Sequence, residues 1–226
     1  MKNAIFVLVV SAAVAVASGA SARQADTLIG DARRQNGLEG EMSRLRQVSP
    51  GSAREGVCPL VRGASAEVNA YVAARLHQVA QQAGAPYAKR ACEPNVVVLF
   101  SAEPDALIRE AARSKRFNYS GVPTAAAEAF RSGADPVRWI HGGDVRSSAA
   151  GDARPHNALI VVDASKAQDV KVSALADYLA LVSLADTRVR PAPMDSIMTL
   201  FDGRDGTPKT LTESDQAYLR SVHRAR

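Results

Sequence analysis

The sequence predicts an α+β fold, a single domain with a small mixed sheet packed by helices. Its 226 residues are 46% hydrophobic and 23% charged, a globular composition that excludes a disordered or fibrous chain. Apolar residues recur with a helical period in several segments, and short β-branched runs lie between these segments. Their order is helix–strand–helix–helix–strand–strand–helix, which is typical of one sheet covered by helices.

The first 22 residues have the features of a signal peptide. Lys2 precedes the apolar run Ile5–Ala17, and Ala20–Ala22 offers the small residues that signal peptidase accepts. The run is shorter than the roughly 20 residues that cross a bilayer. We therefore expect cleavage near Arg23, a periplasmic or secreted location, and no membrane span after signal removal.

Residues 23–56 are polar and contain glycine, so we expect a mobile N-terminal arm with one short helix at residues 38–48. The α+β domain then spans residues 57–226. Its first helix begins after Ser65, a suitable N-cap, carries apolar side chains on one face, and ends at Gly84.

The middle of the chain supplies the strands. Asn95–Phe100 is a β-branched run, which predicts a strand buried on both faces. Pro104 is a favourable first-turn residue for the next helix, and Thr124–Arg131 is a short alanine-rich helix. We predict further strands at Val137–His141 and Ala158–Val162.

The segment Leu175–Ala185 is apolar nearly all round, which predicts a buried central helix. Asp177 interrupts this pattern. A buried carboxylate is costly without a partner, so Asp177 either faces solvent or meets a group such as an arginine. A closing helix begins at Thr212-Glu213-Ser214-Asp215, where the threonine hydroxyl and a nearby carboxylate can cap free backbone amides.

The chain has two cysteines, Cys58 and Cys92, too few for a four-cysteine zinc site. In an exported protein such a pair most simply forms a disulfide. We therefore predict a structural disulfide between them.

Charge and motifs exclude several classes of function. The net charge is +5, but the basic residues are scattered without interleaved aromatics, so nucleic-acid binding is not expected. The sequence contains no phosphate loop, Gly-x-Gly-x-x-Gly, Gly-x-Ser-x-Gly, Ser-x-x-Lys or His-Glu-x-x-His. We expect no nucleotide cofactor and no catalytic residue of these types.

One group of residues around the predicted strand 137–141 is a candidate cleft: Trp139, His141, Asp144, Arg146 and His156. Trp139 and His141 point to the same face of the strand, because side chains alternate along it. The group is either a solvated strand end or a cleft. In the second case His141, Asp144 and His156 form a possible metal site.

Two blocks, residues 57–100 and 175–220, resemble a group of uncharacterised exported proteins of alphaproteobacteria. The first holds Cys58-Pro59 and Cys92-Glu93-Pro94 before the valine run, and the second holds the central helix and the sequence Leu-Thr-Glu-Ser-Asp. The resemblance covers most of residues 57–223 and implies export but no activity.

The second block also resembles the C-terminal half of zincin-type metallopeptidase-like proteins, in which a metal-binding helix precedes a Ser-Ile segment and a Leu-Thr-x-x-Asp helix start. The two metal-binding histidine positions of that pattern fall at Ala176 and Ala180, and the glutamate position falls at Asp177. Alanine cannot bind a metal. The resemblance therefore implies a degenerate zincin-like core without its metal.

These observations predict an exported, non-catalytic envelope or periplasmic protein that binds an unknown partner, with its oligomeric state open. The alternative is a metal-dependent hydrolase that uses His141, Asp144 and His156. A third possibility is an accessory of a peptidoglycan or surface-polymer enzyme.

Overall fold

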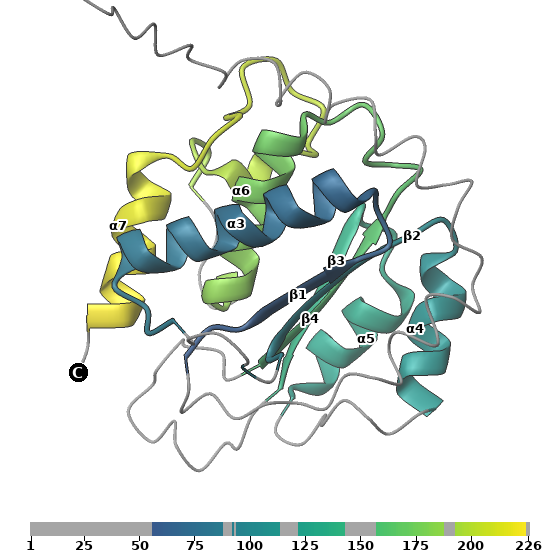
Figure 1. Cartoon of the computed structure of the whole chain (residues 1–226). Helices are drawn as coiled ribbons and strands as arrows, with labels where there is room; N and C mark the ends of the chain where they lie inside the picture. Colours follow the sequence, from purple (N-terminus) through teal and green to yellow (C-terminus); the bar gives the residue numbers. More distant parts are fainter. Residues whose placement is uncertain are drawn as a thin grey trace, which may run out of the picture.

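The computed structural model describes residues 56–87, 92, 94–113, 122–142, 157–187 and 193–224. The predicted signal peptide and residues 23–55 of the predicted arm, with its short helix, lie outside these ranges. Within them the chain forms a mixed four-stranded sheet with helices on both faces, which confirms the predicted single α+β domain (Figure 1). No helix in the described ranges is long and apolar enough to span a membrane.

The sheet has the strand order β1–β2–β4–β3, in which β1, β2 and β4 are parallel and β3 runs antiparallel to β4. The strands are β1 (Pro59–Arg62), β2 (Val96–Ser101), β3 (Val137–Gly142) and β4 (Asn157–Asp163). Strands β2, β3 and β4 lie where the sequence predicts them, within one residue at each end. Burial on both sides of β2 and β4 explains the continuous apolar runs of these two strands.

Strand β1 was not predicted. It has only four residues, begins at a proline, is half-buried at its start, and lies at the edge of the sheet. Its register pairs Val61 with Val98, and Val61 is 2% exposed. Pairing with the neighbouring strand, rather than local sequence preference, therefore defines this element.

One face of the sheet is covered by three helices, α3 (Ala66–Ala83), α6 (Val172–Leu184) and α7 (Glu213–Arg224) (Figure 1). As predicted, α6 is a central helix, and every residue of it except Ser173 is buried. It begins three residues before the predicted start at Leu175. The larger hydrophobic core lies between this layer and the sheet.

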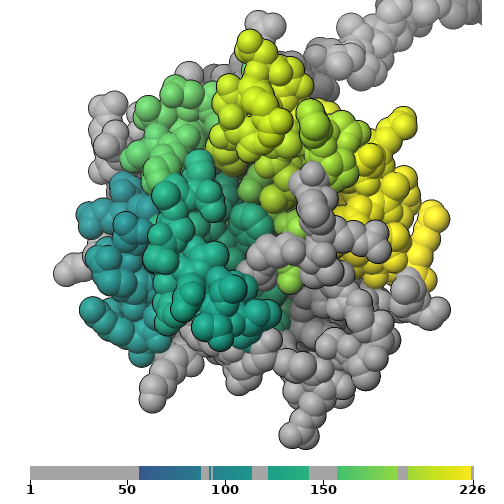
Figure 2. Space-filling model, turned by 180° about the vertical axis from the view of Figure 1, so that it is seen from behind, coloured from purple at the N-terminus to yellow at the C-terminus, as the bar shows by residue number. Residues whose placement is uncertain are grey.

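The other face carries α4 (Pro104–Arg113) and α5 (Thr124–Ser132), which begin where the sequence predicts. Their buried side chains pack against the residues of β2, β3 and β4 that point to this face, in a second hydrophobic cluster. In the view from behind, the teal surface of α4 and α5 faces the reader, and the yellow surface of α7 lies to one side (Figure 2). The molecule therefore has three layers, with the sheet in the middle.

The predicted ends of α3 are confirmed. The hydroxyl of Ser65 accepts a hydrogen bond from the backbone N–H of Val68, at 3.3 Å. Gly84 has a left-handed backbone, with a φ of 75°, and closes the helix. Gly63, before this helix, has a φ of 97°, and a Cβ there would lie 2.0 Å from the carbonyl oxygen of Phe100. Only glycine permits this approach of the two strand ends.

The predicted disulfide between Cys58 and Cys92 is present, with a Cα–Cα distance of 6.1 Å. Beside it, the buried side chain of Asn95 accepts from the backbone N–H of Cys58, at 2.9 Å, and donates to the carbonyl of Gly56, at 2.8 Å. These contacts hold the start of β1 against the start of β2. A disulfide is compatible with an oxidising, exported location.

Candidate functional site

The structure places two of the predicted cleft residues on β3, facing α6. Trp139 packs against the core of the α3–α6–α7 layer, and His141 contacts α6. Asp144, Arg146 and His156 lie outside the described residues, so the metal set His141, Asp144 and His156 stays a prediction. Among the residues that are described, no group of three or more His, Cys, Asp or Glu side chains is placed to hold a metal ion.

His141 and His223 have a structural role that the sequence did not indicate. The Nε2 atom of His141 lies 2.7 Å from the carbonyl oxygen of Val182, and Nε2 of His223 lies 2.9 Å from that of Leu184. The last carbonyls of a helix lack partners within the helix. Because a carbonyl only accepts, both Nε2 atoms must carry a proton and donate. The two rings therefore cap the C-terminal end of α6, and Nε2 of His141 has no lone pair for a metal.

Three aromatic rings are in contact with one another between β3, α6 and the segment that follows η4 (Ile197–Thr199). The ring of Tyr178 meets Trp139 edge to face, with centroids 6.3 Å apart, and meets Phe201 in the same manner at 5.3 Å. We call these three residues the aromatic cluster. Burial raises the pKa of the Tyr178 hydroxyl far above its usual value, and the negative charges of Asp135 and Asp202 add to this shift. Tyr178 therefore stays neutral at physiological pH.

The outer edge of β3 runs beside the aromatic cluster. The N–H of Asp163 donates to the carbonyl of Pro136 at 2.8 Å, which fixes the hydrogen-bonded pairs of the antiparallel ladder. By alternation, Arg138 and Ile140 bond to β4, whereas the N–H and C=O groups of Val137 and Trp139 point outward. No strand of the described ranges pairs with this edge. Its backbone groups are a template for an added strand.

The indole N–H of Trp139 is a buried hydrogen-bond donor without an acceptor among the described residues. A buried donor without a partner costs about 1–3 kcal/mol. This unsatisfied donor lies on β3, next to the outward-pointing backbone groups of Val137 and Trp139.

The three α6 residues at the predicted zincin-like positions are buried in the core. Ala176 and Ala180 have no exposed surface, and Asp177 is 2% exposed. The Oδ1 atom of Asp177 accepts from Nε of Arg75 at 2.5 Å, and Oδ2 accepts from the N–H of Leu211 at 2.9 Å. The predicted arginine partner is therefore Arg75. These contacts hold α3, α6 and the start of the C-terminal segment together.

A second buried carboxylate, that of Asp215, connects the Ser-Ile segment with the Leu-Thr-x-x-Asp helix start. Asp215, 3% exposed, accepts from Oγ of Ser196 at 2.6 Å, from the N–H of Ile197 at 2.9 Å, and from the N–H of Thr212 at 3.1 Å. The N–H of Asp215 donates to Oγ1 of Thr212 at 3.2 Å. The predicted capping box of α7 is thus confirmed, and its carboxylate also fixes the Ser-Ile segment.

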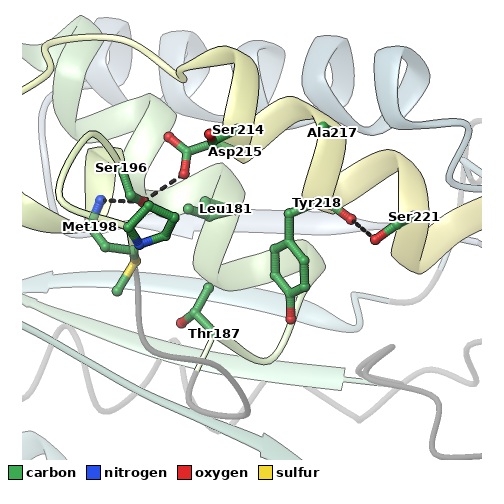
Figure 3. A pocket seen from close by; sticks show the side chains of 10 residues that line it. Leu181, Thr187, Ser196, Met198, Ser214, Asp215, Ala217, Tyr218 and Ser221 are labelled. Atoms are coloured by element: carbon green, nitrogen blue, oxygen red, sulfur yellow. Dashed lines mark hydrogen bonds between the residues drawn. The ribbon is translucent and has the colours of Figure 1, made fainter.

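A pocket of about 410 Å³ lies between α6, the short 3₁₀ helix η4 (Ile197–Thr199) and α7 (Figure 3). Leu181, Met198 and the ring of Tyr218 line its interior, and Thr187 lies at its base (Figure 3). The sequence did not indicate this pocket. Its lining comes from segments that are distant in sequence, and no motif marks their meeting point.

The fold and these contacts define a three-layer α+β protein with one disulfide, a sheet edge that no described strand pairs with beside aromatic rings, and a separate pocket. No known family model matches the chain, and neither the characterised proteins nor the solved structures searched gave a match. A functional assignment therefore depends on the geometry of the chain itself.

Proposed function

We propose that the protein is an exported, non-catalytic protein of the periplasm or envelope, with a degenerate zincin-like core, that binds an extended polypeptide along the outer edge of β3. The observation that carries the proposal is the row of outward-pointing backbone groups at Val137 and Trp139, next to the aromatic cluster. An extended chain can pair with such an edge through main-chain hydrogen bonds and place alternate side chains against neighbouring residues.

The aromatic cluster suits this binding mode. Side chains of Val137 and Trp139 point toward α6, so an added strand in register with β3 presents every second side chain toward the same rings. Aromatic side chains give large contact areas at low cost in conformational entropy and are frequent centres of binding energy. Trp139 is the only tryptophan of the chain and reports binding by its fluorescence.

Two features support a non-catalytic protein. Alanine at 176 and 180 offers no metal ligand on α6, and both residues are packed in the core. Asp177 accepts hydrogen bonds with both of its oxygens, so it is held as a structural carboxylate and not as a general base. The signal-peptide features of residues 1–22 and the disulfide support export.

Hydrogen exchange tests the proposal on the mature, disulfide-bonded chain, with decapeptides selected from a random phage-displayed library as probes. In the free protein we expect the amide of Trp139 to exchange faster than that of Ile140, because only Ile140 bonds to β4. Bound peptide should slow the exchange of Trp139 and leave that of Ile140 unchanged.

Trp139→Ala should weaken peptide binding about tenfold or more. Tyr71→Ala, which removes an exposed aromatic ring on α3, is the matched control and should leave the affinity unchanged. The proposal is wrong if selection yields no peptide, if bound peptides protect another segment, or if Trp139→Ala binds like the parent. Slow exchange of Trp139 in the free protein would also contradict it.

The alternative function is that of a metal-dependent hydrolase that uses His141, Asp144 and His156. While Nε2 of His141 donates to the carbonyl of Val182, only Nδ1 carries a lone pair that can bind a metal. Zinc binding that is lost in both His141→Ala and His156→Ala, together with activity lost on chelation, would favour the hydrolase over the binding protein.

A further inference from the structure

We infer that the pocket between α6, η4 and α7 is a binding site for an uncharged, mainly apolar small molecule that carries an amide or hydroxyl group. The inference is independent of the polypeptide site. None of the described residues that line the pocket belongs to β3 or to the aromatic cluster. The volume, about 410 Å³, lies within the range of small-molecule sites.

The interior of the pocket is apolar and adaptable. Leu181 of α6 forms part of the wall between the helices, and Met198 of η4 faces it from the side (Figure 3). The ring of Tyr218 projects from α7 into the same space (Figure 3). Methionine is flexible and polarisable, so it fits ligands of irregular shape, and an aromatic ring favours edge-to-face contact with another ring.

The electrostatics of the pocket select against charged ligands. No Lys, Arg or His is among its described lining residues, so an anion meets no cationic side chain. The one carboxylate, Asp215, already accepts three hydrogen bonds and is 3% exposed. Placing a charge in an apolar site without a partner is costly. A neutral ligand avoids that cost.

Hydroxyl groups supply the polar contacts. Ser214 and Ser221 lie on the exposed side of α7 at the mouth of the pocket, and their oxygens can accept hydrogen bonds. Thr187 lines the base, and its Oγ1 atom is buried with no partner in the described ranges. Rotation about χ1 of Thr187 turns this hydroxyl toward the pocket. A ligand amide or hydroxyl can then make the hydrogen bond that the free protein lacks.

A matched set of probes tests the inference: 4-phenylbutanamide, 4-phenylbutanoate and 4-phenylbutylamine, which share one apolar body. Binding is followed in the mature chain by the methyl NMR signal of Met198. Met194, 82% exposed, is the internal reference. We expect the amide to shift the signal of Met198 in a saturable manner, with an affinity about tenfold higher than that of either charged probe.

Two variants with matched controls locate the site. Ala217→Phe places a ring at the mouth of the pocket from an exposed position and should abolish the saturable shift, whereas Ala125→Phe on exposed α5 should not. Thr187→Val keeps the shape and should weaken amide binding about fivefold, whereas Thr210→Val, at an exposed position, should not. Circular dichroism verifies that each variant is folded.

Several results would overturn the inference. These are no saturable shift with any probe, equal binding of all three probes, or amide binding that survives Ala217→Phe. Equal loss of binding by Thr187→Val and Thr210→Val would remove the assigned role of Thr187. Failure of the peptide experiment at β3 leaves these outcomes unchanged, because that experiment reports a different surface.

Discussion

The two faces of the sheet differ in what they bury. In the described residues, the α4–α5 face has a hydrophobic core of aliphatic side chains and Phe130. It also has one buried charged side chain, Arg138, which reaches the exposed carboxylate of Asp105 at 2.7 Å. The α3–α6–α7 face buries two carboxylates with their donors, and it adjoins both the aromatic cluster and the pocket. Among the described residues, the α4–α5 face is therefore mainly a hydrophobic core. The α3–α6–α7 face combines packing with buried polar contacts and lies next to both proposed sites.

The largest effect is expected on the α4–α5 face. Phe130 is 1% exposed and lies in the second core cluster. Phe130→Ala should lower the free energy of unfolding by about 3–5 kcal/mol, measured by urea denaturation. Under native conditions the variant should still bind both the selected peptides and 4-phenylbutanamide as the parent does. Loss of either binding in the folded variant would break the proposed separation of the two faces.

The next effect concerns the ion pair on the α3–α6–α7 face. Asp177→Ala removes two hydrogen bonds and leaves Arg75 and the N–H of Leu211 without their acceptor, so we expect a loss of about 2–4 kcal/mol. A second substitution, Arg75→Met, should recover part of this loss, because it removes the unpaired charge. The control is Glu110→Gln, which disrupts an exposed pair with Arg113. An equal change in both variants would contradict the structural role of Asp177.

A smaller effect is expected for the pair on the opposite face. The Asp105 side chain is 70% exposed, so solvent screens its interaction with Arg138. Asp105→Asn should cost less than about 1 kcal/mol in urea denaturation. A loss as large as that of Asp177→Ala would mean that the two faces depend equally on buried ion pairs.

At neutral pH, Tyr178→Phe should change the free energy of unfolding least of these variants. Its effect should become measurable only at high pH, where the tyrosine hydroxyl ionises. The raised pKa of Tyr178 means that the native state holds the phenolic proton more tightly than the unfolded chain, where the pKa is 10.0. The stabilisation is complete below pH 10 and decreases as the pH rises above it. Urea denaturation from pH 7 to 11 should show this decrease in the parent. Its slope should be lower in Tyr178→Phe, and equal slopes would contradict the assigned burial.

The sequence predicted the elements whose signals are local. The apolar runs of β2 and β4, the N-cap at Ser65 and the capping box at Thr212 depend on neighbouring residues and are confirmed. Strand β1 was missed because its pairing with β2 defines it. The need for a partner at Asp177 followed from its place in an apolar helix, but Arg75, 102 residues earlier, becomes its partner only through the packing of α3 on α6.

The candidate sites were harder to predict for the same reason. The common face of Trp139 and His141 followed from strand alternation, whereas the role of His141 at the end of α6 depends on a contact across 41 residues. The pocket joins α6, η4 and α7, and its side chains are of ordinary types. Only the folded chain brings them together.

The most direct test of the central claim, a non-catalytic protein, is the zinc content of the mature chain, purified without a His-tag and incubated with zinc at neutral pH. We expect less than a stoichiometric amount of tightly held zinc after gel filtration, both in the parent and in His141→Ala. About one zinc per chain in the parent, lost in both His141→Ala and His156→Ala, would contradict the account and support a metal-dependent hydrolase.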